Sequence, residues 1–232
     1  MNQSVPYSNN ISDLCIRTRM QERLAVFLAL IAGYIDAVGL IRWKTYVSFM
    51  SGNTTQLGTA FSAYTSEIMI TSLTVIGFFF LGIYAGTCLS LWKNIKIRTL
   101  PFFIVSGILI FYTIADLFCP FGKVVSVAVI GFAMGLMNTI VTSVGNQNVN
   151  TDFVTGTLNS LARNTAMLTM TRDRLKKAEY RANAFHLLLL WIGFLAGAFA
   201  SPFLLSLSGN LALLFPALLL TVCGLMITDS KL

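Results

Sequence analysis

Carboxylate, amide and hydroxyl side chains gather in two short stretches of an otherwise apolar chain. Ser48–Gln56 reads Ser-Phe-Met-Ser-Gly-Asn-Thr-Thr-Gln, and Thr151–Asn159 reads Thr-Asp-Phe-Val-Thr-Gly-Thr-Leu-Asn. Each stretch contains a glycine, Gly52 or Gly156, at which we expect a helix to begin or break. Because an interrupted helix exposes unpaired backbone N–H or C=O groups, each stretch is a candidate site for an ion or a polar solute.

Asp36 lies inside an apolar run, where an ionisable group is costly and usually faces a bundle interior or a watery cavity. Two interpretations stay open: Asp36 lines a cavity and binds a cation or proton, or it hydrogen-bonds a neighbouring helix end. For the two stretches, the competing interpretation is that Ser51 and Thr155 are simple N-caps. The candidate solute-binding residues are Asp36, Asn53, Thr54, Thr55 and Gln56 from the first half, and Asn138, Thr155, Thr157 and Asn159 from the second.

Signatures of enzymes and metal sites are missing from the sequence. It contains no H-E-x-x-H motif, no G-x-S-x-G motif and no Walker loop. The single histidine, His186, and the four scattered cysteines argue against a zinc or iron–sulfur site. We therefore expect a protein that is not an enzyme and holds no cofactor and no metal.

The composition indicates that membrane-spanning helices carry the polar residues described above. Hydrophobic residues make up 56% of the 232 residues and charged residues 11%, against about 25% charged residues in soluble domains. A helix crosses a bilayer with about 20 mostly apolar residues. We therefore predict an all-α polytopic transmembrane bundle with six spans: Leu24–Ile41, Ile68–Trp92, Leu100–Phe118, Val124–Val144, Ala184–Ser206 and Leu211–Thr228.

Two further segments, Tyr46–Tyr64 and Thr151–Met170, are moderately apolar and could raise the number of spans to eight. Six spans place 13 of the 16 Lys and Arg residues on the side of the N-terminus, whereas eight spans place 11 there. Because Lys and Arg favour cytoplasmic loops, we prefer six spans, in a multi-pass cell (inner) membrane protein with both termini cytoplasmic. Topology then explains the net charge of +7 without nucleic acid as a partner.

The chain also reads as two halves of one pattern. We assign residues 1–23 to a cytoplasmic N-terminal segment, 24–118 to a first membrane repeat, 119–123 to a connecting loop and 124–228 to a second membrane repeat. The aligned stretches are Gly33–Ala37 with Gly135–Thr139, Phe49–Gly58 with Phe153–Ala162, and Gly82–Gly86 with Gly193–Gly197.

Three spans in each half would make the repeats inverted, an arrangement that is common among secondary transporters. The Gly-x-x-x-Gly pairs Gly82/Gly86 and Gly193/Gly197 let helices approach closely. We expect them to pack the second and fifth spans within one chain, with a homodimer contact as the alternative.

Several of these stretches resemble the YoaK family, also designated DUF1275. They are Gly33–Gly39, Val47–Gly58 and Phe153–Arg163, and Gly135–Asn138 is similar to the family's Gly-x-Gln-Asn element, with Met137 where Gln is usual. The likeness covers roughly Glu22 to Leu225. The resemblance implies a multi-spanning, mostly bacterial membrane protein and supplies no substrate.

Two hypotheses about function follow. The first is a permease or channel-like protein for a small polar or ionic solute, with its site between the two repeats. The second is a non-transporting membrane protein that binds partners or lipid through the basic segment 172–181, which contains Arg172, Arg174, Lys176, Lys177 and Arg181. The partners that we expect are the lipid bilayer and a small solute.

Overall fold

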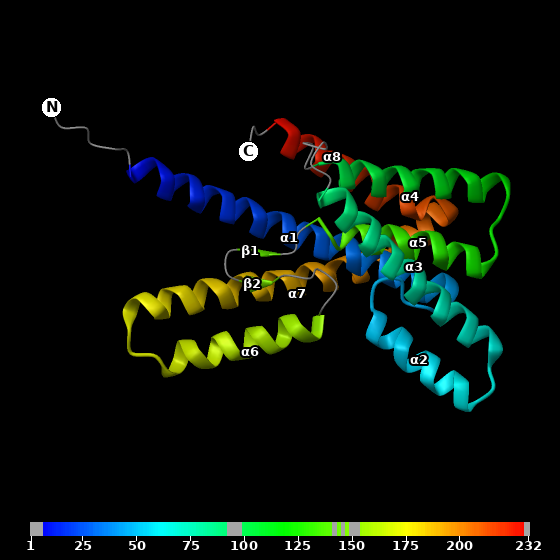
Figure 1. The fold of residues 1–232 in the computed structure, drawn as a ribbon, viewed down its shortest axis with the longest axis horizontal. Helices are drawn as coiled ribbons and strands as arrows, with labels where there is room; N and C mark the ends of the chain where they lie inside the picture. Colours follow the sequence, from blue (N-terminus) through cyan, green and yellow to red (C-terminus); the bar gives the residue numbers. More distant parts are fainter. Residues whose placement is uncertain (1–6, 92–98, 141–142, 145–146, 149–153, 230–232) are drawn as a thin grey trace.

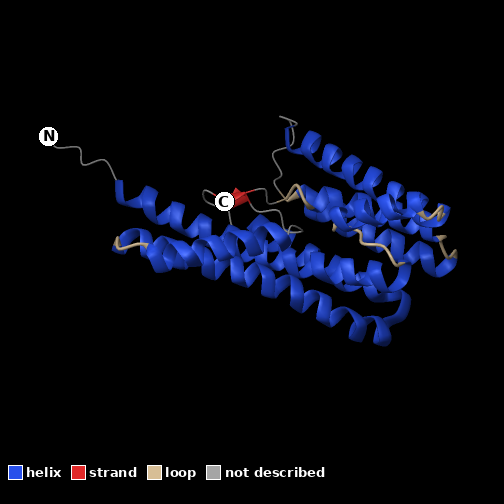
Figure 2. Cartoon of the chain, turned by 90° about the horizontal axis from the view of Figure 1, so that it is seen from below, coloured by secondary structure: helices blue, strands red, loops and turns tan. Residues whose placement is uncertain are grey.

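The computed structural model describes residues 7–91, 99–140, 143–144, 147–148 and 154–229. Helices make up nearly all of this part of the chain, and the strands form one short hairpin (Figure 2). In chain order the elements are α1 (Tyr7–Trp43), α2 (Met50–Ser62), α3 (Ser66–Leu91), α4 (Leu100–Phe118), α5 (Lys123–Met137), β1 (Ser143–Val144), β2 (Gln147–Asn148), α6 (Val154–Met170), α7 (Arg174–Ser208), η1 (Gly209–Leu213) and α8 (Leu214–Asp229).

Four helical stretches are long and apolar enough to cross a membrane: Gln21–Trp43, Ser66–Leu91, Leu100–Phe118 and Arg174–Ile227. The last of these contains α7, η1 and α8, so it covers two of the six predicted spans. Large apolar side chains point outward from these helices, including Phe80, Phe111 and Phe199, which are each about two-thirds exposed or more. Such a surface matches the hydrocarbon of a bilayer, so the chain is a helical membrane protein.

The predicted fourth span is wrong at its end. We expected the helix to run to Val144, but α5 is a shorter apolar helix that ends at Met137, and Ser143–Val144 pairs with Gln147–Asn148 as a two-residue antiparallel ladder. Beyond Met137, Thr139 and Ile140 donate to carbonyls only three residues back, so the α-helical bonding gives way to a tightened last turn. The prediction of an all-α fold holds apart from this ladder.

Helices α1 and α7 pack side by side and run parallel (Figure 1). Gly193 lies against Val26 and Leu30, and Gly197, one turn further along α7, lies against Leu30 and Tyr34. A Cβ atom added at Gly197 would lie 2.8 Å from the Leu30 carbonyl carbon and 2.9 Å from the Tyr34 nitrogen. Since both are backbone atoms that side-chain motion does not clear, glycine is needed here for the close approach.

Helices α3 and α5 form a second parallel pair with the same kind of contact. Gly82 of α3 lies against the backbone of Phe132 and Leu136, and Gly135 of α5 lies against the carbonyl of Phe79. Gly86 lies against Thr139 at the end of α5. The four predicted packing glycines therefore lie at helix contacts within one chain, but they join α3 to α5 and α7 to α1, and do not join the second and fifth spans to each other.

The two pairs are equivalent in their contacts. Gly33 of α1 meets the Phe194 carbonyl, just as its aligned partner Gly135 meets the Phe79 carbonyl. Gly82 meets the backbone of Phe132 and Leu136 in the same way that Gly197 meets the backbone of Leu30 and Tyr34, so Gly82 corresponds to Gly197. The sequence alignment instead pairs Gly82 with Gly193, which lies one helical turn before Gly197. The sequence alignment of Gly82–Gly86 with Gly193–Gly197 is therefore out of register by four residues.

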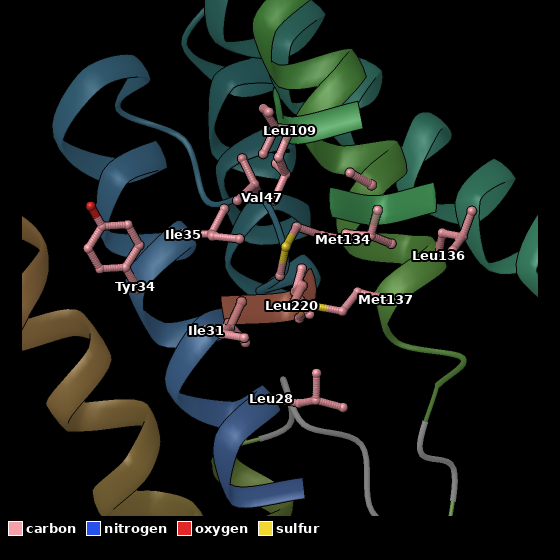
Figure 3. Close-up of a cluster of buried hydrophobic side chains, with 14 of the residues drawn as sticks. Leu28, Ile31, Tyr34, Ile35, Val47, Leu109, Met134, Leu136, Met137 and Leu220 are labelled. Carbon is pink, nitrogen blue, oxygen red and sulfur yellow. The ribbon is translucent and has the colours of Figure 1, made fainter. Parts of the chain in front are cut away.

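The antiparallel helices α4 and α8 complete the bundle. The Ser106 hydroxyl donates to the Ala217 carbonyl at 2.7 Å, and Gly224 lies against the ring of Phe103. The core lies where α1, α4, α5 and α8 meet, as Figure 3 shows for the buried side chains of Leu28, Ile31, Leu109, Met134 and Leu220.

Candidate functional site

The Asp36 carboxylate is fully engaged by the chain that follows α1. Its Oδ1 accepts from the backbone N–H groups of Val47 and Ser48, each at 2.8 Å, and its Oδ2 accepts from the Ser48 hydroxyl at 2.8 Å. The residue is 4% exposed. This geometry matches the interpretation in which Asp36 hydrogen-bonds the chain at the end of a neighbouring helix, here the residues just before α2.

These bonds determine where α2 begins. Asp36 lies seven residues before Trp43, the last residue of α1, which corresponds to about 10 Å along the helix axis. The chain leaves α1, turns back beside Asp36 and starts α2 at Met50. The N-cap residue is Phe49, which makes no side-chain capping bond. Helix α2 therefore starts beside Asp36, about two helical turns before the level at which α1 ends.

Gly52 allows two aromatic rings to lie over the first turn of α2. The rings of Tyr46 and Phe49 meet edge to face with centroids 5.2 Å apart. A Cβ atom at Gly52 would lie 2.5 Å from the Phe49 ring and 3.1 Å from the Tyr46 ring. Gly52 and Gly156 are both the third residue of their helix, because α2 begins at Met50 and α6 at Val154. A helix start near each glycine is what we predicted, and Ser51 is not the N-cap.

Asn53 is the buried polar residue of the first predicted stretch. It is 0% exposed, and its Nδ2 donates to the Tyr46 carbonyl at 2.7 Å. Its Oδ1 is buried and has no partner in the described part of the chain. An orphaned buried amide oxygen costs free energy unless a solute or water meets it.

The hydroxyls next to Asn53 are arranged differently. Thr54 and Thr55 are exposed, and they donate to the carbonyls of Met50 and Ser51 in their own helix at 2.8 and 3.0 Å. Gln56 is half-buried. Helix hydroxyls that donate to the preceding turn are already satisfied, so Thr54 and Thr55 need no cavity around them.

The second predicted stretch lies elsewhere in the molecule. Thr155 and Asn159 are exposed and Thr157 is half-buried, while residues 151–153 lie outside the described residues. Asn138 follows the last residue of α5, and its buried Oδ1 has no partner among the described residues.

Helix α2 packs on α3, and α6 packs on α7. The α2–α3 pair and the α6–α7 pair extend toward opposite ends of the molecule (Figure 1). No extensive interface joins α2 to α6 within the described ranges. The structure thus brings Asp36 and Asn53 together around residues 46–48. It does not bring the α2 and α6 side chains into one site.

Sequence reasoning missed the partners of the polar groups. The groups that engage Asp36 are mostly backbone N–H groups, which every residue except proline carries, so side-chain types gave no signal. The Tyr34 hydroxyl donates to the Ala212 carbonyl at 2.9 Å. Because Tyr34 lies in an apolar run, nothing in the sequence indicated this hydrogen bond. Within the described ranges, no three His, Cys, Asp or Glu side chains are grouped as metal ligands would be.

Comparison with known proteins adds the family and little else. A family model described as a protein of unknown function (DUF1275) matches residues 24–226. No curated protein and no solved structure matches the chain significantly.

Proposed function

The chain belongs to the DUF1275 family of proteins of unknown function. From the arrangement of its helices and buried polar groups, we propose that it is a permease or channel-like protein for a small polar or ionic solute. It spans the cell membrane six times, with α1, α3, α4, α5, α7 and α8. Helix α2 enters the bilayer from one face and α6 enters from the other.

Contacts at one end of the bundle support six spans. Arg42 donates to the Gly209 carbonyl and to Asn210 Oδ1, at 2.7 and 2.8 Å, which joins the end of α1 to the start of η1. Lys123 Nζ lies 3.0 Å from Glu67 Oε1, which joins the start of α5 to that of α3. Each contact alone is compatible with six or with eight spans. Six spans are favoured because all of these termini lie at the same end of the bundle (Figure 1), whereas eight spans would put the end of α1 and the start of α3 on opposite faces.

The matching glycine contacts support two inverted halves. Helix α1 packs on α7 as α5 packs on α3, with Gly33 and Gly135 in equivalent positions. In six alternating spans α1 and α5 run in opposite directions, so the pseudo-two-fold axis lies in the membrane plane. Inverted halves of this kind are a frequent framework for moving a solute across a bilayer.

The start of α2 beside Asp36 is the observation that carries the proposal. It sets a helix N-terminus, with no side-chain cap, at the level of Asp36 along α1, next to the orphaned Oδ1 of Asn53. Polar groups without partners at membrane depth favour water or a polar solute nearby. Because no extensive interface joins α2 to α5 within the described ranges, Asn53 and Asn138 serve in this proposal as two successive contacts on the pathway and not as one site.

Flux through proteoliposomes tests the proposal. Glycerol and urea are followed by light scattering, and H⁺, Na⁺, K⁺ and Cl⁻ by pH- and voltage-sensitive dyes. At least one of these solutes is expected to cross faster than through protein-free liposomes, and Asn53→Leu or Asn138→Leu should lower that flux at least tenfold. Thr59→Val is the matched control in α2, because Thr59 is exposed and its hydroxyl donates to Thr55 and Gln56 of its own helix.

Each variant is reconstituted only after it elutes as a single species in size-exclusion chromatography. Absence of flux for every solute in the wild-type protein would contradict the proposal and favour a membrane protein that does not transport. Equal flux in the Asn53→Leu, Asn138→Leu and Thr59→Val variants would reject the assigned pathway.

A further inference from the structure

Five cations surround the connection between α6 and α7. Arg172 lies in the three-residue turn, and Arg174, Lys176, Lys177 and Arg181 lie in the first eight residues of α7. All five side chains are exposed. We call these five residues the basic turn. Asp173 and Glu179 are the acidic residues between them.

No contact in the described part of the chain accounts for these charges. The one ion pair recorded there is Lys123–Glu67, which involves none of the basic turn. The Asp173 carboxylate instead accepts from the Leu175 N–H at 2.9 Å as the N-cap of α7. Arg174, Lys176 and Lys177 lie at the N-terminus of α7, where the helix dipole disfavours cations. Folding alone therefore does not explain their presence.

Apolar side chains are exposed in the same place. Met170, the last residue of α6, is 84% exposed, and Leu175, in the first turn of α7, is 83% exposed. Exposed apolar residues interleaved with Lys and Arg are typical of segments that lie in the head-group region of a membrane. A partner made only of soluble anions would leave Met170 and Leu175 in water.

The basic turn lies close to the bilayer boundary along α7. The apolar run of this helix begins at Ala184, so Arg181 is about 5 Å and Lys177 about 10 Å from it along the axis. The polar zone on each side of the hydrocarbon is about 5–8 Å thick. Extended Lys and Arg side chains add several ångströms of reach. Lipid phosphates are within this range at high local concentration, because the protein is already embedded in the membrane.

We propose that the basic turn binds the head groups of anionic phospholipids in the leaflet next to it, while Met170 and Leu175 insert among them. This surface is distinct from the pathway assigned to Asn53 and Asn138, and it does not depend on whether the protein transports a solute. Under six spans with the N-terminus inside, the leaflet is the cytoplasmic one.

The test uses the full-length protein in neutral detergent, titrated with phosphatidylglycerol or phosphatidylcholine and observed by native mass spectrometry. The wild-type protein is expected to bind phosphatidylglycerol in preference to phosphatidylcholine. Arg174→Gln/Lys177→Gln should weaken phosphatidylglycerol binding about tenfold or more, because each basic residue near an anionic surface contributes about fivefold in affinity. The matched control is Lys44→Gln/Lys123→Gln, which removes two cations at the other end of the bundle and should change binding by less than about twofold.

Two further arms identify the ligand. Met170→Ser/Leu175→Ser should also weaken phosphatidylglycerol binding, and an excess of inorganic phosphate should not displace the lipid from the wild-type protein. Equal binding of the two lipids would overturn the proposal. So would equal losses in the Arg174→Gln/Lys177→Gln and control variants. Displacement by phosphate would assign the site to a free anion instead. None of these outcomes depends on flux, so this proposal and the proposed function fail separately.

Discussion

At the scale of single residues, Asp36 shows that a buried carboxylate can have a structural role in place of a ligand-binding one. A charge in an apolar run suggests a ligand for a cation, but both oxygens of this carboxylate accept hydrogen bonds from residues 47 and 48. A buried carboxylate is costly unless such donors surround it. Asp36 therefore positions α2, and in the function proposed above the orphaned amide oxygen of Asn53 is the group that meets a solute.

The three hydrogen bonds of Asp36 predict unequal effects of two substitutions. Asp36→Ala leaves the N–H groups of Val47 and Ser48 buried without partners, which should cost about 3 kcal/mol and lower the Tm by roughly 5–10 °C. Asp36→Asn keeps Oδ1 as the acceptor for both N–H groups, and its Nδ2 donates to the Ser48 hydroxyl. It should therefore lower the Tm by less than half as much as Asp36→Ala.

Thermal unfolding of the purified protein in detergent, followed by intrinsic fluorescence, measures these shifts. Asp116→Ala is the control, because the described contact of Asp116 is a single bond from the Phe121 N–H, at 2.9 Å. Its loss of stability should be smaller than that of Asp36→Ala. If Asp36→Ala unfolds at the wild-type temperature, Asp36 does not hold the start of α2.

At the scale of the elements, glycine determines which helices become neighbours. The α1–α7 and α3–α5 pairs approach through Gly33, Gly197, Gly82 and Gly135, each facing backbone of the opposing helix. Lipid replaces water around these helices, so association depends on close packing more than on the hydrophobic effect. Small residues at the contacts are therefore what hold the two halves together.

Two glycines of α3 provide a matched test of this packing. A Cβ atom at Gly82 would lie 2.9 Å from the Leu136 nitrogen, so Gly82→Ala should destabilise the protein by about 1–3 kcal/mol. A Cβ atom at Gly77 would meet no other atom within 4 Å, so Gly77→Ala should leave stability unchanged. Chemical denaturation in mixed micelles compares the two variants. Equal stability of Gly82→Ala and Gly77→Ala would show that α3 does not pack on α5 through Gly82.

At the scale of the whole molecule, the arrangement of helix ends predicts membrane topology. The ends of α1 and α4 meet where Trp43 and Tyr112 pack with ring centroids 6.3 Å apart, and the start of α5 pairs with the start of α3 through Lys123 and Glu67. These ends belong on one face, opposite the basic turn. Since cytoplasmic loops carry most Lys and Arg, we propose that this face is external.

Labelling of cysteines in intact cells tests this topology. With the other cysteines replaced, Cys119, which is exposed after the end of α4, should react with an impermeant maleimide, and so should Ser66→Cys at the start of α3. Arg172→Cys should react only after the membrane is permeabilised. Protection of Cys119 in intact cells, with labelling of Arg172→Cys, would show that the orientation proposed here is inverted.

The sequence by itself determined the membrane class, the helical segments and the family. Apolar runs long enough to span a bilayer must form helices, because hydrocarbon offers no partner for backbone polar groups. The run from Leu24 accordingly lies within the longer α1, and the runs from Ile68 and Leu100 closely match α3 and α4. The helix starts near Gly52 and Gly156 were predictable for a local reason, since they depend on residues adjacent in the chain.

Only the tertiary structure decided which groups meet. It paired α1 with α7 and α3 with α5, moved the equivalence of Gly82 from Gly193 to Gly197, and ended α5 at Met137. It also engaged Asp36 with backbone donors and separated α2 from α6. These outcomes depend on backbone groups that all residues share and on contacts between segments distant in sequence. Side-chain types and their spacing therefore indicated which glycines lie at helix contacts, but they did not indicate the partner of each.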